Sequence, residues 1–95
     1  MSASEFGREF EDDRYAADVE FRGKVLEVTG AVAEIGKDLV GQYRVVLEGG
    51  VACYFADGEM EHVNVLHLGQ AVTVRGYFRA QQGRPVLDGC QFSVE

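Results

Sequence analysis

Residues 24–32, KVLEVTGAV, decide the fold class because their side chains alternate with a period of two. Apolar or small side chains recur at every second position, with Glu27 and Thr29 between them. This alternation is typical of a β-strand that buries one face. Gly30 interrupts the series, and a glycine inside a strand commonly marks a bulge or a sharp coil of the sheet. We therefore expect a strongly coiled strand here.

Four later segments repeat the same alternation. The pair Gly49-Gly50 between the second and third segments predicts a tight hairpin turn. Gly76 interrupts the fourth segment as Gly30 interrupts the first. Residues 35–41, which include two glycines, predict a loop after the first strand. The later strands are expected over residues 43–47, 51–55, 72–79 and about 85–94.

Two helices are expected around these strands. Residues 4–20 predict the first, with Ser4 as its N-cap. We expect Phe10 and Phe21 to pack against the sheet and to close an open end of it. Residues 57–67 predict a second, short helix. The apolar stripe of the first helix consists of Phe6, Phe10, Ala17 and Phe21.

The order of the elements is a helix, three strands, a short helix and two strands. Five short, glycine-kinked strands with a helix between the third and fourth are typical of the OB-fold, a closed β-barrel. An open meander would leave long unprotected edges, so other five-stranded barrels are the main alternative. The 95 residues fit one domain. In this domain residues 1–22 form the N-terminal helix packed on the barrel, and residues 23–95 form the barrel.

Charge is unevenly spread along this acidic chain. Its formal net charge is −7 and its pI is about 4.7. Residues 1–20 carry seven acids against two arginines, and residues 57–61 carry three more acids. Residues 69–84 hold three arginines and no acid. Binding to phosphate backbones relies on Lys and Arg, so a chain this acidic is a poor default candidate for that role.

Two features of the sequence bear on the location of the protein. No stretch approaches the roughly 20 apolar residues of a transmembrane helix, so no membrane insertion is expected. The start, MSASE, lacks the basic and apolar runs of a signal peptide. We therefore expect a cytoplasmic protein, or an envelope or secreted protein if a leader has been removed.

Four segments carry a family resemblance: YAADVEFRGKVLEVTGAVAEIGKD (15–38), GGVACYF (49–55), LGQAVTVRGYF (68–78) and LDGCQFSV (87–94). They resemble the tRNA-anti-like family of small bacterial OB-fold proteins. The resemblance implies an OB-fold barrel. The family name records a similarity to anticodon-binding domains, and many members are envelope lipoproteins or secreted proteins. The family supplies no catalytic residues.

No motif in the sequence indicates catalysis. A Ser/His/Asp arrangement, a GxGxxG segment and a phosphate loop are all missing. The acids fall mainly on the N-terminal helix and in the 57–61 segment, where solvated faces are expected. His62 and His67 are five positions apart, which places them on different faces of a helix and disfavours a metal site. We therefore expect a binding protein without a metal or cofactor, and not an enzyme.

Cys53 and Cys90 are expected on the inward faces of the third and fifth strands. These strands are neighbours in an OB-fold, so a cross-strand disulfide is feasible if the Cα atoms come within roughly 7 Å. The alternative, which we favour, is two buried free thiols that act as small apolar core residues. Neither cysteine lies beside a histidine or in a CxxC pair, so neither is expected to be catalytic.

Aromatic and basic side chains that alternation turns outward are the remaining signal. OB-folds usually bind ligands across strands two and three and the adjoining loops. Tyrosine rings among arginines are the components of a stacking platform for single strands. The same residue types are enriched at protein interfaces. The candidate ligand-binding residues are Lys37, Arg44, Tyr54, Arg75, Tyr77 and Arg79.

Three functions are compatible with these observations. The first, which we favour, is a protein-interaction or accessory module with an unidentified protein partner. The second is weak binding of single-stranded nucleic acid on the Tyr/Arg residues, with the acidic helix turned away from the strand. The third is a mimic of nucleic-acid charge that occupies a basic protein through residues 5–20 and 57–61. A steep salt dependence would mark the second or third function.

Overall fold

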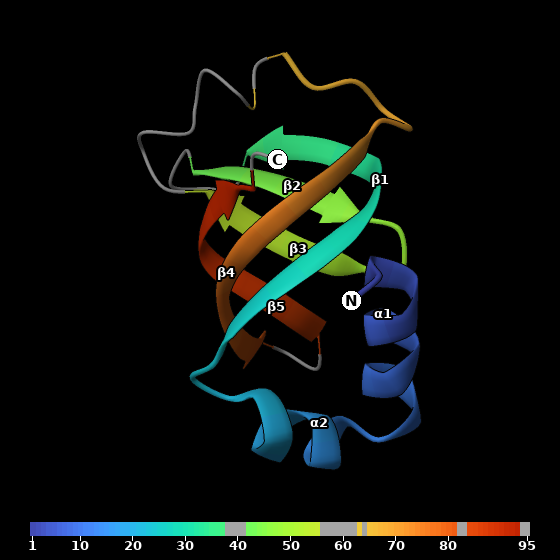
Figure 1. Ribbon diagram of the computed structural model, residues 1–95, viewed down its shortest axis with the longest axis vertical. Helices are drawn as coiled ribbons and strands as arrows, with labels where there is room; N and C mark the ends of the chain where they lie inside the picture. Colours follow the sequence, from blue (N-terminus) through green and yellow to red (C-terminus); the bar gives the residue numbers. More distant parts are fainter. Residues whose placement is uncertain (38–41, 56–62, 64, 82–83, 94–95) are drawn as a thin grey trace.

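Five β-strands wind into a closed barrel, with two helices at one end of it (Figure 1). The strands are β1 (Val25–Lys37), β2 (Tyr43–Leu47), β3 (Val51–Phe55), β4 (Ala71–Gln81) and β5 (Arg84–Phe92). The computed structural model describes residues 1–37, 42–55, 63, 65–81 and 84–93. The order around the barrel is β1-β2-β3-β5-β4, and β4 pairs again with β1. β3 and β5 are parallel and the other neighbouring pairs are antiparallel, which confirms the predicted OB-fold barrel.

Strand β1 is longer than expected, and different parts of it pair with its two neighbours. Its first part, from Val25 to Ala31, pairs with β4, and its second part pairs with β2 as far as Lys37. The prediction of a loop over residues 35–41 is therefore wrong at its start, and residues 38–41 lie outside the described residues. A register shift between Val32 and Glu34 marks a bulge. Bulges bend a strand and increase its twist, which lets β1 pass from one partner to the next.

The N-terminal segment forms two helices, α1 (Ala3–Asp12) and α2 (Arg14–Phe21), and the prediction of a single helix is wrong. Asp13 separates them with φ −153° and ψ 89°, and its carboxylate accepts the N–H of Ala16 at 3.0 Å. Ser4 lies inside α1 and is not its N-cap. Ser2 caps this helix instead, because its Oγ accepts the N–H of Glu5 at 3.1 Å. Local side-chain hydrogen bonds thus decide where both helices begin.

Phenylalanines from both helices surround Phe78 of β4. The ring centroid of Phe78 lies 5.5 Å from Phe6, 6.0 Å from Phe10 and 6.1 Å from Phe21. None of the four side chains is more than 9% exposed. The predicted packing of Phe10 and Phe21 against the barrel is confirmed. The two helices close one end of the hydrophobic core with aromatic rings, whose burial contributes strongly to stability.

The predicted short helix between β3 and β4 falls mainly on residues that the structure leaves undescribed, 56–62 and 64. Val63, from the same segment, is 2% exposed and belongs to the core. This connection therefore contributes at least one side chain to the barrel interior.

Helix α1 approaches the β2–β3 turn so closely that glycine is required on both sides of the contact. A β-carbon on Gly7 would overlap the carbonyl oxygen of Gly49. Gly49 has a φ of +94°, and a β-carbon there would lie 2.6 Å from the carbonyl oxygen of Ala3. Glycine tolerates both the positive φ and the close backbone approach. The contact holds α1 against the turn, so that the helix lies beside the ends of β2 and β3 that the turn connects.

We expect Gly7→Ala to destabilise the protein, although alanine favours a helix more than glycine does. The new methyl group would overlap the Gly49 carbonyl, and overpacking of this kind costs about 1–3 kcal/mol. Chemical denaturation measures the free energy of unfolding. Gly36→Ala is the control, because no atom of a described residue lies within 4 Å of a β-carbon there. Equal stability of the two variants would contradict the close contact.

Phe10→Ala is expected to lower the free energy of unfolding by about 3–5 kcal/mol, as is usual when a buried aromatic ring is removed. Phe10 is 1% exposed, whereas Tyr15 on α2 is 81% exposed. Tyr15→Ala is therefore the matched control, and we expect it to change stability by less than about 0.5 kcal/mol. Thermal unfolding followed by circular dichroism compares them. A loss as small for Phe10→Ala would show that α1 does not support the core.

Candidate binding surface on strands β2 and β3

The structure divides the predicted ligand-binding residues between two parts of the barrel wall. One group lies on the end of β1 and on β2 and β3, and the other lies on β4. β4 pairs with β1 and β5, while β2 and β3 occupy the opposite side of the ring. The six side chains therefore do not form one continuous face. The first group is Lys37, Arg44 and Tyr54, and the second group is Arg75, Tyr77 and Arg79.

The first group brings positive charges next to tyrosine rings. Arg44 and Tyr54 are directly opposite one another in the β2–β3 ladder. Lys37 is opposite Tyr43, and its Nζ lies 4.8 Å from the centroid of the Tyr43 ring. A cation at this distance from an aromatic face is attracted to it. Tyr43 and Arg44 are consecutive in β2, so the pair Lys37 and Tyr43 lies on the other face of the sheet from the pair Arg44 and Tyr54.

The second group is more exposed and partly neutralised. Arg79 forms an ion pair with Asp88 of β5. Tyr77 is 59% exposed. Arg75 lies opposite Glu27 of β1. The outer surface of β4 therefore mixes acidic and basic side chains and does not concentrate positive charge.

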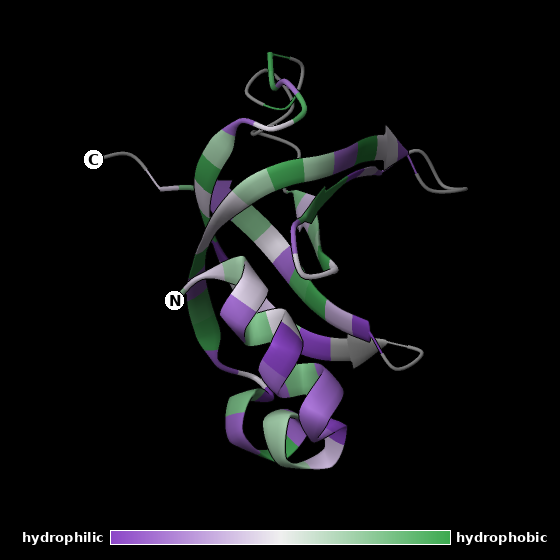
Figure 2. Cartoon of the chain, turned by 90° about the vertical axis from the view of Figure 1, so that its right-hand side faces the viewer, coloured by the Kyte–Doolittle hydropathy of each residue, from purple (hydrophilic) through white to green (hydrophobic). Residues whose placement is uncertain are grey.

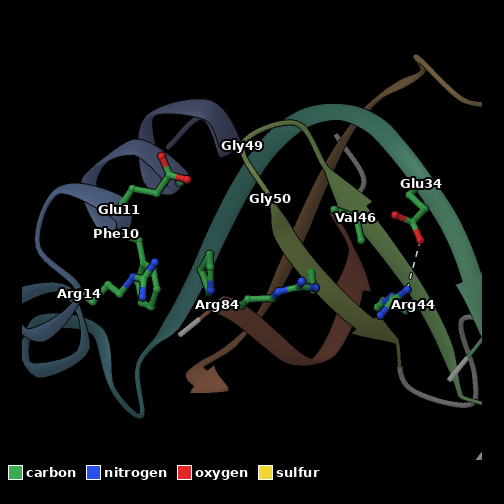
Figure 3. A pocket seen from close by; sticks show the side chains of 12 residues that line it. Phe10, Glu11, Arg14, Glu34, Arg44, Val46, Gly49, Gly50 and Arg84 are labelled. Atoms are coloured by element: carbon green, nitrogen blue, oxygen red, sulfur yellow. Dashed lines mark hydrogen bonds and ion pairs between the residues drawn. The ribbon is translucent and has the colours of Figure 1, made fainter. Parts of the chain in front are cut away.

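A groove of about 380 Å³ lies on the outer side of β2 and β3, next to α1 (Figure 3). We call it the β2–β3 groove. It occupies the face on which OB-folds commonly bind ligands, and its volume is at the lower end of the range for small-molecule sites. Its uncharged lining comes from α1, β2, the turn, β3 and the start of β5. These residues are Gly7, Phe10, Val46, Gly49, Gly50, Ala52 and Pro85.

Five charged side chains line the β2–β3 groove, and three of them are arginines. Arg44 forms an ion pair with Glu34 of β1 at 3.2 Å. Arg14 and Arg84 are exposed, and within the described part of the chain neither has an ion-pair partner. Glu11 is the second acid. Three arginines and two glutamates give the groove a formal charge of +1, in a chain whose net charge is −7.

Arg44 keeps one buried donor unused. Its Nε is shielded from solvent and has no hydrogen-bond partner among the residues that the structure describes. A buried polar group without a partner costs about 1–3 kcal/mol, and such groups in folded proteins require an explanation. Because this nitrogen is shielded from solvent, an external ligand reaches it only if the Arg44 side chain moves.

Most acids of the two helices lie away from the β2–β3 groove. Glu9, Asp12, Asp13 and Glu20 line a separate hollow between α1 and α2. The two hollows have no lining residue in common among the described residues. Figure 2 shows many hydrophilic residues on the side of the helices that faces the viewer. These four acids are thus separate from the lining of the groove, whereas Glu11 belongs to it.

Sequence reasoning missed two of the three groove arginines. Arg14 belongs to a segment whose acids conceal it, and the break between α1 and α2 is what brings it to the groove. Arg84 begins β5, directly before the single proline of the chain. The loop between the fourth and fifth strands commonly takes part in OB-fold binding. The position of Arg84 at this loop was the signal that could have identified it.

Cys53 and Cys90 lie on the two strands whose parallel pairing closes the barrel. Both are free thiols and 0% exposed. The Cys90 thiol donates a hydrogen bond to the carbonyl oxygen of Leu87 at 3.2 Å. A hydrogen bond with Cys90, together with burial, raises the pKa of the Cys53 thiol well above its usual value. Both cysteines occupy core positions, and the raised pKa disfavours a reactive thiolate at Cys53.

The described residues contain no group of three or more His, Cys, Asp or Glu side chains placed to hold a metal ion. His67 is exposed, and His62 is outside the described residues. Within the described part of the chain, no helix is long and apolar enough to cross a membrane.

The closed five-stranded barrel with the order β1-β2-β3-β5-β4 defines the chain as an OB-fold protein. It belongs to the tRNA_anti-like family, whose profile matches residues 1–91. A comparison with curated proteins gave no match. Among solved structures, the chain is similar to a "putative nucleic acid-binding lipoprotein" from Klebsiella pneumoniae, with a TM-score of 0.78 and 20% sequence identity. The similarity covers 99% of this chain and 92% of that one, and at this identity it establishes the fold.

Thiol reagents are expected to label the folded protein slowly and to label both cysteines rapidly after unfolding. The thiols are buried, and the raised pKa of Cys53 leaves less thiolate at any pH below it. Iodoacetamide labelling at about pH 8, with and without denaturant, measures the rates by mass spectrometry. Equal rates in both states would contradict the core positions. Absence of labelling in unfolded, unreduced protein would reveal a disulfide.

Proposed function

We propose that this protein is a non-enzymatic OB-fold module that binds single-stranded nucleic acid weakly across β2 and β3. The observation that carries the proposal is the β2–β3 groove, where three arginines meet on a chain whose net charge is −7. With two glutamates beside the arginines the groove has a formal charge of +1, and a cleft of net positive charge attracts anionic ligands. Binding of an anionic ligand would also explain why a groove on a negatively charged molecule carries a positive charge.

Stacking and charge lie along one line on this face. Tyr54 is partly exposed and lies opposite Arg44, and two residues nearer the turn, on the same face, Ala52 lies opposite Val46. Bases stack on tyrosine rings with little regard to sequence, at about 1–3 kcal/mol per base, while arginines contact the phosphates. This order supports a strand that runs from Tyr54 toward the turn.

Net charge sets the expected strength of binding. A few arginine–phosphate contacts give a modest attraction without sequence preference, and the acids elsewhere on the molecule weaken it. The separate hollow that collects Glu9, Asp12, Asp13 and Glu20 keeps most helix acids away from the strand. We therefore expect binding in the micromolar range at low salt.

The chemistry of the groove supports binding, and among the described residues that line it Glu11 is the one acid without an ion-pair partner. The described lining of the groove includes no Ser, Cys, His or Lys that could serve as a nucleophile. The carboxylate of Glu34 is engaged by Arg44. General acid–base catalysis needs a group poised to exchange a proton, and the guanidinium groups that dominate the groove do not exchange protons near neutral pH.

A protein partner is the second candidate, because apolar side chains are exposed elsewhere on the molecule. Tyr15 and Val19 lie one helical turn apart on α2 and are 81% and 64% exposed. Val25 and Tyr77 lie opposite one another on β1 and β4 and are 50% and 59% exposed. Tyrosine and other large apolar side chains are frequent at the centres of protein interfaces.

Fluorescence anisotropy with labelled single-stranded DNA and RNA tests the nucleic-acid proposal. We expect a Kd of about 1–100 μM at low salt and a loss of about tenfold between 50 and 200 mM salt, as two or three phosphate contacts would give. Arg44→Gln combined with Tyr54→Ala is expected to weaken binding about tenfold or more, because one charge and one stacking contact are lost. The matched control, Arg75→Gln with Tyr77→Ala, removes the same residue types from β4.

Two outcomes would count against the proposal. Equal losses in the two double variants, or no loss in either, would contradict binding on β2 and β3. No binding of either nucleic acid at low salt, where the electrostatic attraction is strongest, would overturn the proposal and favour a protein partner.

A further inference from the structure

Helix α1 bounds the β2–β3 groove at one end. Along the ladder the order toward the turn is Arg44 with Tyr54, then Val46 with Ala52. The turn itself lies against α1, where Gly7 and Gly49 leave no space between the two backbones. A strand that follows β2 and β3 in this direction therefore meets the helix and cannot continue along the same path (Figure 3).

Two unpaired arginines stand at this closed end. Val86 of β5 is level with Ala52 in the parallel ladder, so Arg84, two residues earlier, is level with the turn. Arg14 begins α2 and lines the same groove. Both side chains are exposed, and the described residues provide an ion-pair partner for neither. Figure 3 shows Arg84 between Arg14 and Arg44.

Two guanidinium groups at a closed end match the chemistry of a terminal phosphate. A phosphate monoester carries a charge of about −1.5 to −2 at pH 7, whereas each phosphate inside a strand carries a single charge. Guanidinium groups bind phosphate oxygens through pairs of parallel N–H donors. A terminal phosphate therefore gains more from two arginines than an internal phosphate does.

The acids of the groove restrict how much negative charge it accepts. Glu11 and Glu34 line the groove together with the arginines. Glu34 is paired with Arg44, which reduces the positive charge at that end. Glu11 of α1 offsets one of the two remaining positive charges, so the closed end, with Arg14, Arg84 and Glu11, keeps a net charge of +1. This distribution fits one phosphate group held near the helices.

We infer that the β2–β3 groove recognises the phosphorylated end of a single strand, with the terminal phosphate held by Arg14 and Arg84. The inference rests on the proposed function and names the part of the ligand that the groove selects. The nucleotides next to that end extend toward Arg44 and Tyr54. The volume of about 380 Å³ suits one small ligand unit at the closed end.

The test compares oligonucleotides of one sequence that carry an internal dye and a 5′-phosphate, a 3′-phosphate or no terminal phosphate. We expect the wild-type protein to bind one phosphorylated form about tenfold more tightly than the unphosphorylated form, as one added charge-assisted contact would give. Methylation of that phosphate removes one charge and is expected to abolish most of the preference.

Arg14→Gln combined with Arg84→Gln is expected to bring the two affinities to within about twofold of each other, because the charge that distinguishes the strand end is removed. Both arginines are exposed, so the unfolding midpoint is expected to stay close to that of the wild type. Arg75→Gln is the matched control. It removes an exposed arginine from β4, outside the groove, and is expected to keep the preference.

Each result decides between the proposals. Equal affinity of the wild type for phosphorylated and unphosphorylated strands would overturn this inference and leave the proposed function in place. A preference that survives in the Arg14→Gln, Arg84→Gln variant would overturn it as well. Failure of all three oligonucleotides to bind would overturn both.

Discussion

Closure of one barrel end by aromatic rings is the constraint on which the rest of the structure depends. A chain of 95 residues has a small core, and an open end would leave Phe78 in contact with water. The three phenylalanines of α1 and α2 cover that ring and thereby fix the helices against the sheet. The same helix that seals the core also bounds the β2–β3 groove. Core packing and the shape of the binding surface are therefore coupled through α1.

Local patterns in the sequence were sufficient to predict the barrel, but they did not predict its irregular features. Alternation is a property of each strand by itself, so it predicted the strands and their order without a structure. The division of the N-terminal segment depends on one carboxylate, that of Asp13, which competes for the N–H of Ala16. The bulge after Val32 is defined by the register with the partner strand, and a single strand does not contain that information.

The binding surface could be predicted only in part, for a related reason. Alternation indicates which side chains face outward, but it does not indicate on which side of a closed barrel they lie. Because β4 returns to β1, Arg75 and Tyr77 lie on a different side from Arg44 and Tyr54. The distant arginines of the groove, at positions 14 and 84, are 70 residues apart in the sequence (84 − 14). Their presence in one groove despite that separation arises from the tertiary fold alone.

Parallel pairing of β3 with β5 also governs what an incomplete chain exposes. The two strands are separated by 29 positions (84 − 55), so during synthesis β3 emerges well before its partner. Until β5 is in place, β3 is an edge strand with unpaired N–H and C=O groups along one side. Its sequence, VACYF, has no charge and no proline, a composition that favours pairing with strands of other chains. Barrel closure thus removes an aggregation-prone edge, and a chain that ends before residue 84 keeps that edge permanently available to its neighbours.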